Sequence, residues 1–256
     1  VRQQLAEVDR ALERLEPLAV VEPSDDTTPR RAAPHPRRNV DRFAPTLARF
    51  IRFTVLGTNS VEPCLDELEV FTASDAPVNV GLATAGAKVA ASSVYANGTV
   101  AIHQTAHLND GQYGNGRSWI SGEIGAGWVQ IELAEPAEIE RVVWARDREG
   151  KFADRLPTKY RVELALQPDA WQTVATSDDR LPFDASRTGE PPASEAYAPE
   201  HAEEVKNLLA RRKELESHLP EAATRPVYAG QFREPEKIQL LRRGDPLQPG
   251  DEVAPA

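Results

Sequence analysis

The sequence predicts a mainly β protein built on an antiparallel β-sandwich, with one helix near each end of the chain. Short segments that alternate apolar and polar residues recur between turn-forming residues from about residue 49 to residue 176, as half-buried antiparallel strands do. No strand–helix–strand alternation occurs, which disfavours a parallel sheet. The two helical patterns lie outside this strand-rich region. We therefore expect one sandwich flanked by a pair of helices.

Composition narrows the class of protein. The chain has 256 residues and a net charge of -10, and this acidity disfavours a nucleic-acid-binding surface. Its single cysteine, Cys64, excludes an internal disulfide, a thiolate zinc site and attachment of a c-type haem. No apolar run approaches the roughly 20 residues that cross a bilayer. The chain opens on Val1 without a signal peptide, so we expect it to be a piece of a longer protein.

Residues 1–19 are predicted to form the first helix, which Pro17 ends. Its apolar residues follow alternating steps of four and three, as in a coiled coil: Val1, Leu5, Val8, Leu12 and Leu15. Residues 199–220 are predicted to form the second helix. Its apolar stripe comprises Val205, Leu208, Leu209, Leu215 and Leu219. Short isolated helices are marginally stable, so we expect the two to pair antiparallel beside the sandwich.

The remaining segments differ sharply in pattern. Residues 20–46 are rich in Pro, Arg, Asp and Thr and have no steady period, so they are predicted to be a solvated linker. Residues 47–185 carry the sandwich. The predicted strands span 49–56, 65–71, 79–93, 128–133, 139–146, 159–166 and 171–175. Pro136 is expected to break the chain between two of them. In the tail, residues 221–256, only 237–241 could pair as a strand.

A glycine-rich polar loop precedes the strand at 128–133. It contains Asn109, Asp110, Asn115 and Arg117. Carboxylate, amide and carbonyl oxygens are the ligands that a hard cation such as calcium prefers. The alternative is an ordinary hairpin loop, because Asn, Asp and Gly fill turns for conformational reasons.

Residues 79–179 resemble a discoidin-like, coagulation factor V/VIII C-type domain, which is a galactose-binding-like fold. The resemblance is based on the sequence segments N-V-G-L-A-T-A-G-A-K-V-A-A-S-S, L-N-D-G, G-W-V-Q-I-E-L, I-E-R-V-V-W and Y-R-V-E-L. It implies a β-sandwich of the jelly-roll type. Domains of this family commonly bind glycans, lipids or proteins and often carry a structural calcium ion.

The family's closing strands stand first in this chain. R-F-I-R-F-T-V at 49–55 and L-D-E-L-E-V-F at 65–71 resemble the words that normally end the domain. Termini of a sandwich usually lie close together, so we predict a circular permutation. The alternative is that 49–71 closes a preceding, truncated domain. Permutation is preferred because nothing after Asp179 supplies the missing strands.

The whole chain also resembles the middle of large planctomycete multidomain surface proteins associated with cytochrome c. There a discoidin-like segment and a helical hairpin lie between two other domains. Residues 242–256 resemble the start of the downstream domain. The resemblance implies an exported, periplasmic or cell-surface protein. Any haem or catalytic centre would then lie outside this chain, and its partners would include neighbouring domains of the same protein.

Carried onto this sequence, the family's calcium ligands are the side chains of Asp110 and Glu67 and the backbone oxygens of Leu108 and Gln112. Arg117 stands where the family has Ser or Thr, which makes Asn115 or Ser118 the candidate replacement. Oxygen ligands of this kind favour calcium over zinc. The alternative is that Asp110 caps its turn and Glu67 is solvated.

Candidate ligand contacts lie on the polar loops. They are Tyr113, Arg117, Arg146, Asp147 and Arg148, together with Lys151. The alternative is a charged, solvated loop surface. All four tryptophans, Trp119, Trp128, Trp144 and Trp171, are predicted to pack in the core rather than to form a carbohydrate platform, because a tryptophan buries so much area. His103 and His107 have a spacing that suits metal ligands on a helix, but we expect them to be surface or partly buried residues.

Three functions are compatible with these patterns. The first is a non-catalytic binding module, for a carbohydrate or polysaccharide, with calcium as its only cofactor. The second is a structural insert that positions neighbouring domains and binds nothing small. The third, a hydrolytic domain, has little support, because no nucleophile elbow, metalloprotease motif, P-loop or dinucleotide fingerprint is present.

Overall fold

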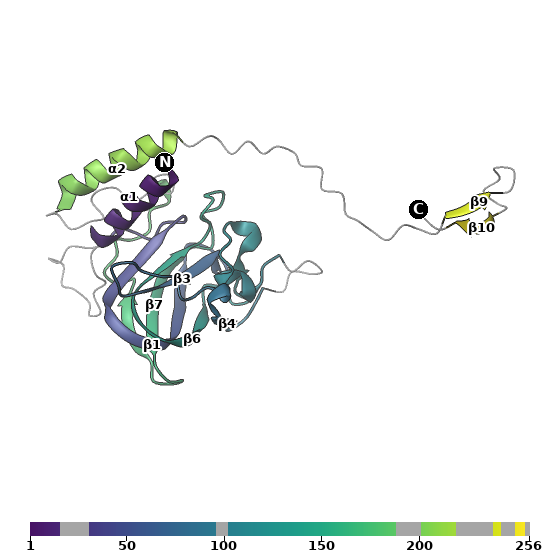
Figure 1. Cartoon of the computed structure of the whole chain (residues 1–256). Helices are drawn as coiled ribbons and strands as arrows, with labels where there is room; N and C mark the ends of the chain where they lie inside the picture. Colours follow the sequence, from purple (N-terminus) through teal and green to yellow (C-terminus); the bar gives the residue numbers. More distant parts are fainter. Residues whose placement is uncertain (16–30, 96–101, 188–200, 219–237, 242–248, 254–256) are drawn as a thin grey trace. The chain divides into compact units, whose positions relative to one another are not determined.

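The computed structural model (Figure 1) describes residues 1–15, 31–95, 102–187, 201–218, 238–241 and 249–253. It divides into two units, residues 1–219 and residues 220–256. In the second unit β9 (Ile238–Leu241) pairs antiparallel with β10 (Pro249–Val253), which confirms the strand predicted at 237–241. The rest of the tail, including the proposed start of a downstream domain, lies mostly outside the described residues.

The first unit is mainly β and antiparallel, as predicted. Its main sheet has the strand order β3-β6-β1-β7-β8, with β4 added on β6. These strands are β1 (Asn39–Thr58), β3 (Glu67–Thr72), β4 (Lys88–Ala91), β6 (Gly127–Ala145), β7 (Pro157–Ala165) and β8 (Gln172–Thr176). A small separate pair joins β2 (Cys64–Leu65) to β5 (Trp119–Ile120). Short 3-10 turns connect the strands: η1 (Ala83–Ala85), η2 (Thr105–Asn109), η3 (Asn115–Arg117) and η4 (Ala185–Arg187).

Two long strands, β1 and β6, form the spine of the sheet (Figure 1). They pair in three stretches, 39–42 with 141–144, 46–48 with 137–139 and 50–55 with 127–132, and the register shifts between them. Pro136 lies at the shift between the last two stretches. The prediction that Pro136 separates two strands is therefore wrong: β6 runs through it, because a proline is tolerated where the ladder is already interrupted.

The β1–β6 ribbon folds back on itself around the core. Trp144 pairs with Asn39, whereas Phe53 lies 14 residues further along β1 and pairs with Val129. A straight strand of that length would separate the two rings by roughly 46 Å. Their centroids are 5.0 Å apart, and Tyr160 from β7 contacts both. The two halves of the ribbon thus enclose one apolar core, in which Ile51, Leu68 and Ile131 are also fully buried.

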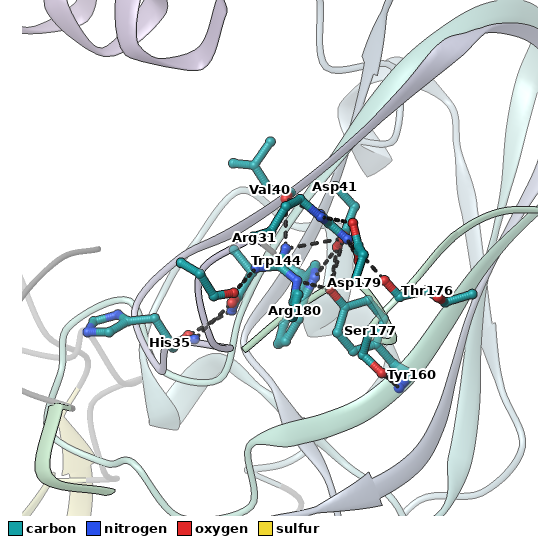
Figure 2. Close-up of polar contacts among 12 residues, drawn as sticks. Arg31, His35, Val40, Asp41, Trp144, Tyr160, Thr176, Ser177, Asp179 and Arg180 are labelled. Carbon is teal, nitrogen blue, oxygen red and sulfur yellow. Dashed lines mark hydrogen bonds and ion pairs between the residues drawn. The ribbon is translucent and has the colours of Figure 1, made fainter. Parts of the chain in front are cut away.

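A buried group of charged and aromatic residues closes the domain where the chain enters and leaves it (Figure 2). We call it the ion cluster, and it comprises Arg31, Asp41, Trp144, Tyr160, Asp179 and Arg180. The backbone N–H of Arg31 donates to the oxygen of Asp179 (2.8 Å), and the N–H of Leu181 donates back to the oxygen of Arg31 (2.8 Å). Entry and exit segments therefore lie side by side.

Asp41 is the acceptor at the centre of the ion cluster. It receives hydrogen bonds from Arg31 Nη1 (2.7 Å), Arg180 Nη2 (3.1 Å), Tyr160 Oη (2.8 Å) and Trp144 Nε1 (2.9 Å). Burial opposes the charge, but the two guanidinium groups outweigh it and lower the pKa of Asp41 to about 2. The predicted linker over 20–46 is consequently wrong in its second half. Arg31 is buried rather than solvated, and β1 begins at Asn39.

Helices form at both predicted places. α1 spans Arg2–Leu15 and α2 spans Ala202–Ser217. They contact each other through a small apolar cluster of Val8, Leu12, Val205 and Leu215. Asp9 and Arg212 form an ion pair of 3.0 Å at the edge of this contact. Within the described residues, neither helix has the length and hydropathy needed to cross a membrane.

Candidate functional site

The start of β3 gathers two loops from distant parts of the chain. Asp66 Oδ2 accepts the N–H of Gly114 (3.1 Å) and the N–H of Arg148 (2.6 Å), while Glu67 Oε1 accepts the N–H of Gly111 (3.0 Å). We call the region formed by 66–69, 108–117 and 147–151 the loop end. Two neighbouring carboxylates thus hold the predicted calcium loop and the predicted charged turn in one place.

Glu67 lies in an unusual environment. Its side chain is buried, with a relative exposure of 1% for the residue, and its Oε2 has no hydrogen-bond partner among the described residues. Burial, together with repulsion from Glu69 and Asp110, raises the pKa of Glu67 to about 8 despite the N–H of Gly111. Asp66 Oδ1 is buried without a partner as well, and burial raises the pKa of Asp66. The loop end therefore buries more carboxylate oxygens than the donors of the described residues satisfy.

The other predicted metal ligands already have partners within the protein. Asp110 Oδ1 accepts the N–H of Gln112 (2.8 Å), and Asp110 Oδ2 pairs with Arg117. Asn115 Oδ1 accepts from Arg146 Nη1 (2.8 Å). Asp110 thus caps its turn, as the alternative interpretation had it. Glu67, in contrast, is buried rather than solvated.

The described residues contain no further candidate for a metal site formed by side chains. Within the described part of the chain, no three or more His, Cys, Asp and Glu side chains are grouped so as to hold a metal ion. The predicted calcium set differs from such groups, because only Glu67 and Asp110 would contribute carboxylates. The side chain of Leu108 is buried in the core, which fixes the backbone of the loop at that point.

Two of the predicted ligand-contacting residues form a pair, in which Tyr113 is exposed and Arg148 is half-buried. Arg148 Cζ lies 4.1 Å from the centroid of the Tyr113 ring, a cation–π contact. Glu69 ties the pair to β3, because its carboxylate accepts from Arg148 Nη2 (2.6 Å) and from Tyr113 Oη (3.3 Å). Tyr113 is 40% exposed, and the side chain of Arg117 is 41% exposed. The loop end therefore presents an aromatic ring and guanidinium groups to solvent.

Arg146 and Asp147 take a different role from the one expected. Both are buried, and they hold the turn at 147–152 from inside. Arg146 donates to the backbone oxygen of Asp154 (2.8 Å) and to its carboxylate (2.8 Å). Asp147 accepts the N–H groups of the residues that follow it, Glu149, Lys151 and Phe152. Neither side chain is presented to a ligand in solution.

The tryptophans divide into two pairs. Trp119 and Trp144 are fully buried, as predicted. Trp128 and Trp171 are only partly buried, and the guanidinium of Arg52 stacks on both. The core prediction is therefore wrong for these two. Strand alternation could have indicated this for Trp128, because Val129 and Ile131 face the core and Trp128 therefore lies on the opposite face of the strand.

The two histidines contact one serine. His103 Nδ1 lies 2.9 Å from Ser118 Oγ, and His107 Nδ1 lies 3.3 Å from the backbone oxygen of Ser118. Burial and the nearby charges of Arg146 and Arg155 lower the pKa of His103. His107 is buried and belongs to η2, whereas His103 precedes it. The pair does not share a helix face.

The chain matches no protein-family model, no curated protein and no solved structure. The interpretation of the loop end is therefore based only on the arrangement of its own residues.

Proposed function

We propose that the chain is a non-catalytic module that binds a polysaccharide at the loop end, with calcium as a structural cofactor. The observation that carries the proposal is Glu67 Oε2, a buried carboxylate oxygen beside the loop of Asp110 that has no partner among the described residues. A buried charge of this kind is costly unless it is protonated, paired or bound to a cation. The exposed ring of Tyr113 and the guanidinium of Arg117 lie on the same loop. They supply stacking and hydrogen-bonding groups for a sugar chain.

The residues fit calcium in part. Glu67 and Asp110 would hold the ion together with the backbone oxygens of Leu108 and Gln112. Asp110 would then exchange its pairing with Arg117 for the ion, which frees that guanidinium for a ligand. Asn115 fits less well, because its amide oxygen already faces the guanidinium of Arg146. Bound calcium would supply the positive charge that the buried carboxylates lack.

The proposed fold is a permuted, discoidin-like jelly roll. Its support is the folded-back β1–β6 ribbon and the place of the early strands within the sheet. Ile51 pairs with Ile131 and Glu69 pairs with Val143, so residues 49–55 and 67–71 lie in the same sheet as the strands that resemble the family. This is the arrangement that a permutation requires.

A structural insert is the second candidate, and one observation favours it. The entry and exit of the domain meet at Arg31 and Leu181. In the chain α1 precedes Arg31 and α2 follows Leu181, and the two helices contact each other. In this candidate the helices run antiparallel as a hairpin, the sheet domain is inserted between them, and the partners are neighbouring domains of the same protein.

The test is a glycan array probed with the whole chain in calcium and in chelator. We expect binding in calcium, loss of binding in chelator, and loss in the Glu67→Gln variant. Glu135→Gln, which changes an exposed glutamate, is the matched control and should bind as the wild type does. Binding that is equal in chelator and in Glu67→Gln would contradict the calcium site. A blank array at high protein concentration would favour the structural insert, and turnover of a bound glycan would favour a hydrolase.

A further inference from the structure

The outer face of the sheet carries a row of residues that the core does not use. Along β1, Ile51, Phe53 and Val55 are buried, whereas Arg52 and Thr54 between them are only partly buried. Alternation along a strand places Arg52 and Thr54 on the opposite face from the core. The same alternation on β6 places Trp128 and Gln130 on that outer face.

An arginine stacks on two tryptophans across this face. Arg52 Cζ lies 4.8 Å from the ring centroid of Trp128 on β6 and 4.1 Å from that of Trp171, which directly precedes β8. Strand order runs β6-β1-β7-β8, so the two rings that contact Arg52 come from segments that are not neighbours in the sheet. Arg52 Nη2 donates to Gln130 Oε1 (2.8 Å), and its Nε has no hydrogen-bond partner among the described residues. The row thus combines two indole rings with a guanidinium that has no carboxylate partner in the described part of the chain.

The charges around this row are opposite in sign to those of the whole chain. The basic residues at outward strand positions are Arg49, Arg52, Lys88, Lys159 and Arg161. In the stretches that pair around the row, 49–55, 88–91, 127–132 and 157–165, the acidic residues are Glu132 and Glu163, which pair with Arg49 (2.9 Å) and Arg161 (3.0 Å). A chain with a net charge of -10 therefore presents a locally basic, aromatic sheet face. Such a face is complementary to an anionic ligand.

We infer that this outer face binds an acidic polysaccharide, a chain of sugars that carry carboxylates. The apolar face of a sugar ring can pack against the flat face of an indole ring. A carboxylate on the same sugar pairs with the guanidinium of Arg52, whose planar fork suits a carboxylate. The inference goes beyond the proposed function, because the surface is not the loop end. Trp128 lies on the outer face of the half of the ribbon formed by 50–55 and 127–132, whereas Glu67 pairs with Ala145 on the other half, and the apolar core lies between the two halves.

The first test is retardation of the whole chain in native gels that contain polygalacturonate, with chelator present throughout. Chelator removes any contribution of calcium at the loop end, so failure of the proposed function and failure of this inference are distinguishable. We expect the wild type to be retarded at low ionic strength and released in high salt. Trp171→Ala and Arg52→Gln should each weaken binding about tenfold or more, on the scale of a lost stacking or charged contact. Phe152→Ala, which removes an exposed aromatic ring outside the Arg52 row, should bind as the wild type does.

Three results would overturn the inference: no retardation of the wild type, equal retardation by neutral dextran, or binding that is lost in Tyr113→Ala and kept in Trp171→Ala. The last result would assign the ligand to the loop end and leave the Arg52 row as a stabilising contact only.

The second test needs no variant, so it stands even if a substitution unfolds the domain. Trp119 and Trp144 are fully buried, so acrylamide quenches chiefly the fluorescence of Trp128 and Trp171. Bound polygalacturonate should shield both rings and lower the quenching constant by at least half, whereas dextran should leave it unchanged. An unchanged quenching constant in saturating polygalacturonate would contradict the inference.

Discussion

Two buried carboxylates, Asp41 in the ion cluster and Glu67 in the loop end, have opposite surroundings. Asp41 receives hydrogen bonds from two guanidinium groups, a phenol and an indole, and its pKa is lowered to about 2. Glu67 receives one backbone N–H, has acidic neighbours, and its pKa is raised to about 8. Both residues are almost fully buried. Burial alone therefore does not decide whether a carboxylate is charged; the donors around it do.

The difference separates a structural site from a candidate binding site. The ion cluster is complete in itself, and its members come from β1, β6, β7 and the segments before β1 and after β8. The loop end is not complete, because Glu67 Oε2 and Asp66 Oδ1 are buried without partners among the described residues. Incomplete buried polar sites are where ligands and ions supply the missing charge. The following predictions test this contrast, beginning with the largest expected effect.

Replacement of Asp41 by Asn should destabilise the domain most. The variant leaves Arg31 and Arg180 buried without their shared carboxylate, and breaking such a pair costs about 3–5 kcal/mol. The free energy of unfolding from urea denaturation measures the loss. Asp178→Asn changes an exposed carboxylate nearby and should stay within about 0.5 kcal/mol of the wild type. A loss below about 1 kcal/mol in Asp41→Asn would remove the structural role of the ion cluster.

Calcium should stabilise the folded chain through Glu67. An ion that binds only the folded state at 100 times its dissociation constant adds about 2.7 kcal/mol to the free energy of unfolding. Thermal or urea denaturation in calcium and in chelator measures this increment. The increment should vanish in Glu67→Gln and persist in Glu135→Gln. Equal stability in calcium and in chelator would leave the loop end without its proposed cofactor.

In chelator, stability should fall as the pH rises through the range where Glu67 titrates. Its pKa is about 8 in the folded chain against an ordinary value of 4.5, so the folded state binds the proton more tightly. The stabilising contribution is fully present below pH 4.5 and is lost as the pH rises through 8. Asp41, with its lowered pKa, is charged throughout that range, so it does not make the free energy of unfolding depend on pH there.

The measurement is the free energy of unfolding of the wild type minus that of Glu67→Gln at pH 5.5 and at pH 8.5. We expect this difference to become more negative by about 1–3 kcal/mol, the cost of a buried group left unsatisfied. A difference that does not change with pH would mean that Glu67 is not buried as an acid in the folded state.

The smallest effect is expected at the surface of the loop end. Arg117→Ala removes a half-exposed ion pair with Asp110, so the free energy of unfolding should change by less than about 1 kcal/mol. Calcium affinity, measured by titration calorimetry, should rise, because Asp110 no longer has a competing cation. Weaker calcium binding in this variant would exclude Asp110 as a ligand.

Local patterns in the sequence predicted much of the fold. Alternation predicted the strand segments within β1, β6, β7 and β8, because these strands have one face in the core and the other outside it. The same alternation is consistent with an outward-facing Trp128, but the size of its side chain led to the prediction that it packs in the core. Trp171 lies just before β8, so strand alternation gave no such indication for it; it contacts Arg52 on the outer face.

Long-range pairing could not be predicted. Arg31 looked like part of a solvated basic linker, and it is buried only because Asp179 and Asp41 lie beside it. Its partner Asp179 is 148 residues away, and no local pattern records such a pairing. Asp147 was also misassigned, because a carboxylate that caps its own turn and one that faces a ligand have the same sequence signature. The loop end was anticipated from the resemblance through Glu67 and Asp110, but the unpartnered oxygen of Glu67 emerges only from the three-dimensional packing.

The meeting of entry and exit segments at Arg31 and Arg180 has a mechanical consequence. The two segments form a parallel bridge, so tension on the flanking chain pulls them in opposite directions along their length. Within the sheet domain, the load then falls first on two backbone hydrogen bonds and on the ion pair between Arg31 and Asp179, in shear. The strands behind them carry no force until these contacts break. The sheet domain therefore lies outside the path of the tension, and its loop end and outer face keep their shape while the chain is stretched.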